Sequence, residues 1–140
     1  MLYVAVSDAG ADSRGPLGRL VTVQLRHHRA AAAIHVALTA PALAAVDGIS
    51  FDRSGALWMV TNGLFDESGT PLGGARLLRL SPTGHLAVLL NSPPWFNYPT
   101  AVVIDDARGS CGTLFIANGA FYGGTPNILA LTPHAGTVTG

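Results

Sequence analysis

Short apolar runs alternate with turn-forming residues along the chain, and three of these runs resemble one another. Each carries a leucine, an aromatic residue, further apolar residues and a small polar residue at its end. The three runs are Leu2–Ser7, Leu57–Asn62 and Leu114–Asn118. They begin 55 and 57 residues apart, and self-similarity at a nearly fixed period is the signature of a repeat architecture. Runs of this length between Gly, Pro, Asp and Ser are typical of β-strands.

Two further series of segments recur with a similar period. One series follows the first runs, at Arg19–Val23, Arg76–Leu80 and Asn127–Leu131. The other series precedes two of them, at Asp47–Asp52 and Thr100–Asp105. One unit therefore reads as strand, turn, strand, long loop, strand, the turn Ser81–Gly84, and a last strand His85–Leu90. A four-stranded meander of about 50 residues predicts a β-propeller blade. An ordinary β-sandwich with similar strands is the alternative.

The alanine-rich stretch Ala30–Ala37 falls where the repeat places a fourth strand. Its composition also suits a helix, but its place in the repeat predicts a strand. On this pattern, residues 1–40 form an incomplete blade, residues 41–92 a complete blade and residues 93–140 a nearly complete blade. We therefore predict an all-β fold, a partial β-propeller of about two and a half four-stranded antiparallel blades from a six-bladed ring.

An incomplete ring leaves apolar sheet faces uncovered, because each blade buries its faces against its neighbours. Two copies of the chain would supply about five or six blades, within the range of about 4–8 known for propellers. A homodimer that completes the ring is therefore one expectation. A fragment of a longer ring is the other.

Composition excludes some classes of function. Eight basic and eight acidic side chains cancel, so no broad positive field attracts nucleic acid or an anionic membrane. We expect neither a signal peptide nor a transmembrane segment in this chain, because a basic leader and a long uninterrupted apolar stretch are both missing from the sequence. The single Cys111 cannot form an internal disulfide. These observations leave the cellular compartment undetermined.

The phrase Val46–Val60, which contains Asp47-Gly48, Asp52, Gly55 and Leu57-Trp58, is the most specific in the sequence. It resembles a blade of the regucalcin/gluconolactonase family (the senescence marker protein type), with Val46 where that family usually has proline. Residues 98–119 resemble the following blade, and the family-like pattern covers roughly residues 2–132. Propellers of the NHL-repeat type share much of the phrase, so it indicates the superfamily better than the activity.

The resemblance implies a chemical role for Asp47. In the lactonase members the aspartate of this phrase binds a divalent cation in the central channel and assists lactone hydrolysis. Carboxylate oxygens suit Ca²⁺, Mg²⁺, Mn²⁺ or Zn²⁺, and a carboxylate can accept a proton from attacking water. The glutamate and asparagine that complete the family's metal site would precede Leu2, and both are missing from this chain. Asp47 would otherwise cap a turn through local hydrogen bonds.

Three further residues are candidates for substrate binding, namely Asn62, Asn118 and Thr100. The two asparagines end the second strands of their blades, where side chains could face a ligand, although Asn before Gly is also a turn former. Thr100 stands at the position equivalent to Asp47 but is not a ligand in the family's pattern. Adjacent His27 and His28 would point to opposite sides of a strand, which disfavours a shared metal ion.

The sequence leaves three functions open. The first is metal-dependent lactone (ester) hydrolysis of a small-molecule substrate by the full-length parent protein, with the isolated chain inactive. The second is a non-catalytic NHL-like propeller that acts as a protein-binding or ligand-binding scaffold. The third is a truncated product with no function of its own. A companion Glu and Asn at channel positions would separate the first from the second.

Overall fold

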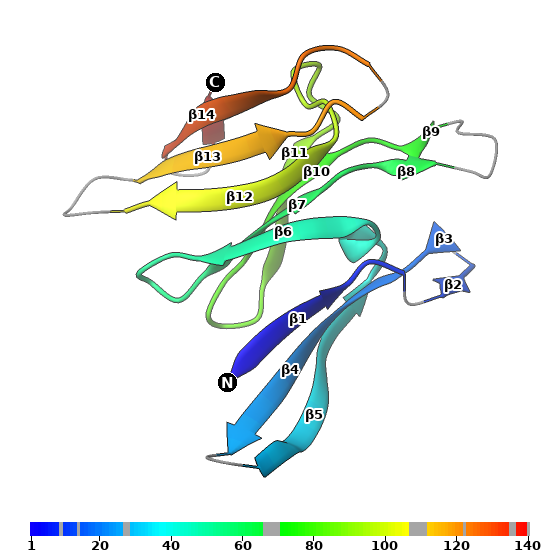
Figure 1. Cartoon of the computed structure of the whole chain (residues 1–140), viewed down its shortest axis with the longest axis vertical. Coiled ribbons are helices and arrows are strands. Elements are labelled where there is room, and N and C mark those ends of the chain that lie inside the picture. Colours follow the sequence, from blue (N-terminus) through cyan, green and yellow to red (C-terminus); the bar gives the residue numbers. More distant parts are fainter. Residues whose placement is uncertain are drawn as a thin grey trace. The chain divides into compact units, whose positions relative to one another are not determined.

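The computed structural model describes residues 1–8, 10–13, 15–26, 29–65, 71–106, 112–121, 123–134 and 137–139. Antiparallel sheets make up nearly all of its regular structure, with one short 3₁₀ turn at Pro41–Leu43 (Figure 1). The chain divides into two compact units, Met1–Val46 and Asp47–Gly140. The expected all-β class is therefore confirmed. No helix in the described part of the chain is long and apolar enough to span a membrane.

The first unit contains a three-stranded sheet in the order β1-β4-β5, labelled in Figure 1. Its strands are β1 (Leu2–Val6), β4 (Gly18–Arg26) and β5 (Arg29–Ala40), and the connection from β1 to β4 contains the ribbon β2 (Ala11–Asp12) and β3 (Gly15–Pro16). The alanine-rich stretch lies within β5, so the strand prediction there is correct. Ser7 follows β1, and its hydroxyl donates a hydrogen bond to the carbonyl of Val46, the last residue of this unit.

The second unit contains two four-stranded antiparallel sheets. One has the order β11-β10-β7-β6, from β6 (Val46–Phe51), β7 (Leu57–Thr61), β10 (Arg76–Leu80) and β11 (Leu86–Asn91). The other has the order β12-β13-β14-β15, from β12 (Pro99–Asp105), β13 (Thr113–Asn118), β14 (Asn127–His134) and β15 (Thr137–Thr139). A small ribbon of β8 (Leu64–Phe65) and β9 (Pro71–Gly73) extends the loop after β7. Both sheets follow chain order, as the repeat predicted.

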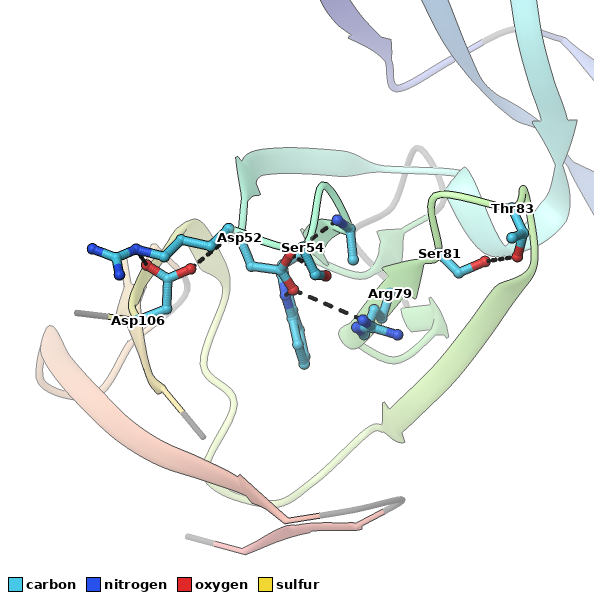
Figure 2. Close-up of polar contacts among 9 residues, drawn as sticks. Asp52, Ser54, Arg79, Ser81, Thr83 and Asp106 are labelled. Atoms are coloured by element: carbon cyan, nitrogen blue, oxygen red, sulfur yellow. Dashed lines mark hydrogen bonds and ion pairs between the residues drawn. The ribbon is translucent and has the colours of Figure 1, made fainter. Parts of the chain in front are cut away.

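The strand registers show that the two sheets are equivalent. Leu57 pairs with Leu80 in one sheet, and Leu114 pairs with Leu131 in the other. Trp58 therefore corresponds to Phe115, and Thr61 corresponds to Asn118. The predicted turn at Ser81–Gly84 is also confirmed, since the Gly84 N–H donates to the Ser81 carbonyl at 3.0 Å and the Ser81 and Thr83 hydroxyls bind each other (Figure 2).

The core of the second unit lies between its two sheets. One sheet contributes Trp58, Val60 and Leu77, and the other contributes Val102, Leu114, Ile116 and Leu131, all of them buried. In each strand these side chains alternate with residues on the opposite face, as the period of two requires. Among the described residues the sheets form no closed ring. The antiparallel all-β architecture is thus established, and the propeller arrangement stays a prediction.

Gly48 lets the two sheets approach closely at one end of β6. A Cβ atom at this position would lie 2.5 Å from the Cα of Ala101 and 2.9 Å from the Val102 nitrogen. Backbone atoms cannot move aside as the end of a side chain can, so the absence of a side chain at Gly48 is a packing requirement. The first residues of β6 and β12 consequently lie next to each other.

Substituting Gly48 with alanine should therefore lower the free energy of unfolding by about 1–3 kcal/mol, through overpacking against β12. The matched control is Ala101→Ser, because Ala101 is exposed at the equivalent position of the next sheet and should tolerate an added atom within about 0.5 kcal/mol. Chemical denaturation of both variants measures the difference. Equal stabilities for Gly48→Ala and the unmodified chain would contradict the close approach.

Candidate functional site

The turn between β6 and β7 is built around the Asp52 carboxylate (Figure 2). Its Oδ1 accepts hydrogen bonds from the Ser54 hydroxyl at 2.6 Å and the Ala56 N–H at 2.9 Å. Its Oδ2 accepts one from the Trp58 indole N–H at 2.9 Å. Gly55 completes the turn with a φ of 81°, which glycine adopts without strain. The aspartate, glycine and tryptophan of the family-like phrase therefore act in folding.

Arg79 extends this arrangement from the neighbouring strand β10. Its guanidinium lies 3.8 Å from the Asp52 carboxylate and 5.4 Å from the centre of the Trp58 ring. Partial burial on its own raises the pKa of Asp52, but hydrogen bonds from Ser54, Trp58 and Ala56 and the charge of Arg79 outweigh that effect. The net result is an Asp52 pKa below its ordinary value. The folded protein thus favours the ionised carboxylate.

A second contact joins the same turn to the loop that follows β12. The Arg53 backbone N–H donates to the Asp106 carboxylate, and the Arg53 guanidinium lies 3.5 Å from its other oxygen (Figure 2). The Arg53 side chain is 66% exposed, so water screens the ion pair and its net contribution is small. The contact fixes the relative position of two turns at one end of the sheets.

Asp47 lies at the start of β6 and is exposed. The Asn62 side-chain amide, just past the end of β7, donates to its Oδ2 at 3.3 Å. Thr100 lies at the start of β12, where its hydroxyl is 3.5 Å from the Ala117 carbonyl. Because Gly48 rests on Ala101, the starts of β6 and β12 are neighbours. Three of the four sequence-predicted site residues therefore gather at one end of the two sheets.

Asn118 lies at the same end of the sheets, where it pairs with Pro99, but its side chain is buried. It is only 3% exposed, and its amide binds three partners within the protein. Its Nδ2 donates to the Trp95 carbonyl at 3.0 Å and to Asn127 Oδ1 at 2.9 Å, while its Oδ1 accepts from the Asn97 N–H at 3.1 Å. These bonds hold the segment before β12 against the end of β13. The geometry gives Asn118 a structural role in place of a ligand-facing one.

The register also shows that Asn62 and Asn118 are not equivalent positions. Asn118 corresponds to Thr61, which is buried and accepts a hydrogen bond from the Arg76 N–H at 2.9 Å. Asn62 corresponds to Gly119. Thr61 was not among the residues singled out in the sequence, although a small polar residue recurs at the end of each run and indicates a shared role. That polar position serves to anchor the strand end in both sheets.

Asp47, Asn62 and Thr100 form a group whose polar atoms can be compared with the oxygen ligands that a divalent cation requires. It offers one carboxylate, one amide and one hydroxyl, and the amide directs its N–H at the carboxylate. Nowhere in the described part of the chain do three His, Cys, Asp or Glu side chains gather closely enough to hold a metal ion. The described residues therefore do not by themselves fit a catalytic metal centre.

The aromatic residues before β12 pack against neighbouring rings. Trp95 and Phe96 meet edge to face with 4.9 Å between ring centres, and Tyr98 and Phe121 meet similarly at 5.0 Å. A shallow apolar hollow of about 250 Å³ lies beside Trp95, between it and Leu129, Ala130 and Leu131. None of the sequence-predicted site residues lines it. His27 and His28 lie outside the described residues.

Comparison with known proteins finds no matching family model, no matching curated protein and no matching solved structure. The likeness to the regucalcin/gluconolactonase and NHL-repeat proteins therefore depends on the residues of the phrase itself. Since Asp52, Gly55 and Trp58 build a turn and a sheet interface, that phrase carries information about the fold. The residues of the sequence-predicted site that remain candidates for binding are Asp47, Asn62 and Thr100.

Removing the Asp52 carboxylate should destabilise the protein through loss of its hydrogen bonds. We expect Asp52→Ala to lower the free energy of unfolding by about 1.5–3 kcal/mol at neutral pH. Asp47→Ala, at the start of the preceding strand β6, is the control and should cost about 0.5 kcal/mol or less, because it loses one long exposed bond. Urea denaturation measures both. Equal losses would show that Asp52 does not organise the turn.

The same carboxylate should also give the stability a pH dependence. A lowered folded-state pKa means that the stabilisation is fully present above the unfolded-state value of about 3.9 and is lost as the pH falls through the folded-state pKa. The unmodified chain should therefore lose more stability than Asp52→Asn between about pH 5 and the acid limit. Parallel slopes of unfolding free energy against pH would contradict this assignment.

Truncation of Asn118 should cost more than truncation of Asn62. Asn118→Ala would leave the Trp95 carbonyl, the Asn97 N–H and the Asn127 amide without their partner, at about 1–3 kcal/mol for each buried group that remains unsatisfied. Asn62→Ala is the matched control and should cost less, because Asn62 is half-buried where Asn118 is buried. Thermal and urea unfolding compare the two. A stable Asn118→Ala protein would return Asn118 to the candidates for ligand binding.

Proposed function

We propose that this chain forms successive blades of a β-propeller similar to the regucalcin/gluconolactonase and NHL-repeat proteins, and that it acts as a binding scaffold for a small polar ligand. Three features support blades. The sheets are meanders in chain order, their registers are equivalent, and two of them pack face to face. A six-bladed ring would place the first strand of each blade, here β6 and β12, along the central channel.

The observation that carries the binding role is the exposed Asp47 carboxylate with the Asn62 amide beside it. A carboxylate and an amide at neighbouring strand ends can accept and donate hydrogen bonds to adjacent hydroxyl groups of a sugar-like molecule. Thr100 on the next sheet adds a hydroxyl group at the same end. The ligand class that suits this set is a small polyhydroxylated molecule, such as a sugar lactone.

Lactone hydrolysis is a second candidate, and the exposed carboxylate of Asp47 is the observation that favours it. A cation bound there would polarise the lactone carbonyl, and the group lies where the resemblance expects a metal ligand. The described residues supply too few oxygen ligands, so this activity would require ligands from elsewhere in a larger assembly. The scaffold is therefore the better supported function.

Titration calorimetry with a sugar lactone, with and without Ca²⁺, Mg²⁺, Mn²⁺ or Zn²⁺, separates the two candidates. The scaffold proposal expects saturable binding that needs no metal and weakens about tenfold or more in Asp47→Ala, which corresponds to loss of about 1.4 kcal/mol. Asp8→Ala, which removes another exposed aspartate, is the control and should bind normally. Metal-dependent acid release that Asp47→Ala abolishes would favour the hydrolase. Binding that ignores Asp47 would refute both.

A further inference from the structure

Two sheets of this chain each have an uncovered apolar face. On the β12–β15 sheet it consists of Ala101, Val103, Phe115, Ala117, Ile128 and Ala130, which are cross-strand neighbours and which we term the Phe115 face. Ile128 is 73% exposed and Val103 is 57% exposed. None of the six residues is polar. Contiguous apolar surface of this kind marks a site of association.

The sheet of the first unit has an uncovered face of its own. It consists of Leu2, Val4, Val21, Val23, Ile34 and Val36, which we term the Val4 face. The registers align them in two rows across β1, β4 and β5, one through Leu2 and one through Val4. Ile34 is 69% exposed and Val36 is 57% exposed. None of these six residues is polar.

The repeat identifies what covers each face. By strand register, Phe115 and Ile128 correspond to Trp58 and Leu77 of the preceding sheet, which are 5% and 0% exposed because they pack on the next sheet. The Phe115 face is therefore the equivalent of a surface that is already buried against a following sheet. Its natural partner is a further sheet of the same repeat.

The Val4 face is equivalent to the opposite side of the interface between the Trp58 sheet and the Ile116 sheet. Leu2 and Val4 correspond to Leu114 and Ile116, which are buried against Trp58, Val60 and Leu77. The chain thus displays one uncovered copy of each half of an interface that it also forms internally. Surfaces related in this way are complementary to each other, as sheets stacked in a repeat are.

We propose that two copies of the chain associate head to tail, with the Phe115 face of each copy packed on the Val4 face of the other. A two-fold axis relates the two contacts, so the dimer is closed and neither face stays exposed to water. This inference rests on the proposal that the sheets are propeller blades. The three main sheets of each copy then give a ring of six.

Light scattering of the purified chain tests the association. The proposal expects a mass twice the 14.4 kDa of one chain. Ile128→Glu and Ile34→Lys each place a charge in both contacts of a homodimer, so each variant alone should be monomeric at concentrations where the unmodified chain is dimeric. Val88→Glu is the control, because Val88 is an exposed valine of β11 outside both faces, and it should stay dimeric.

Mixing the two monomeric variants gives a sharper result. A pair of one Ile128→Glu chain and one Ile34→Lys chain keeps one unmodified contact and places opposite charges in the other, so the mixture should recover the dimer mass. Recovery also shows that both variants are folded. A monomeric unmodified chain, dimers of either single variant, or a mixture that stays monomeric would overturn the head-to-tail pairing.

The result of the association test does not depend on the result of the ligand-binding experiment. A monomer that binds a sugar lactone through Asp47 would refute the association and leave the binding function standing. A dimer whose lactone binding ignores Asp47 would do the reverse.

Discussion

Every main sheet of this protein has apolar side chains on both faces, and this property dictates how the chain can fold. A sheet with one apolar face is satisfied by one neighbour, but a sheet with two apolar faces needs a neighbour on each side. The contact between the sheet containing Trp58 and the sheet containing Ile116 satisfies one face of each. The packing between the two sheets of the second unit and the uncovered apolar faces of the chain both follow from that requirement.

The polar positions are arranged around this packing and do two kinds of work. Asp52 and Asn118 are surrounded by donors and acceptors of the protein itself, and they fix a hairpin turn and the approach to β12. Asp47 is exposed at a strand start and accepts one long side-chain hydrogen bond. A polar group already satisfied inside the protein has little capacity left for a ligand, whereas an exposed carboxylate retains most of its acceptor sites. This difference assigns folding to Asp52 and supports the proposed binding role of Asp47.

The strands could be predicted from the sequence because they repeat, and the helix-prone stretch Ala30–Ala37 shows how far that reasoning extends. Local propensity favours a helix there, yet the residues form part of β5, since tertiary pairing with β4 overrides a weak preference. Side-chain roles were harder to predict. Asn62 and Asn118 look alike in sequence, but a one-residue difference in register leaves one half-buried and buries the other. Sequence spacing does not determine register to that accuracy.

The same reasoning explains why the strongest motif says least about activity. The copies of a repeat are free to differ at positions that no neighbouring sheet contacts. They resemble one another at positions where packing restricts the side chain. Trp58 and Phe115 occupy equivalent positions and both are large aromatic residues, and Trp58 packs on the following sheet. Asp47 and Thr100 also occupy equivalent positions, but they differ in charge and in chemistry. Since packing does not require a carboxylate at the start of β6, its presence there is the more informative departure from the repeat. In a protein built from equivalent sheets, function is to be sought at the positions where those sheets differ.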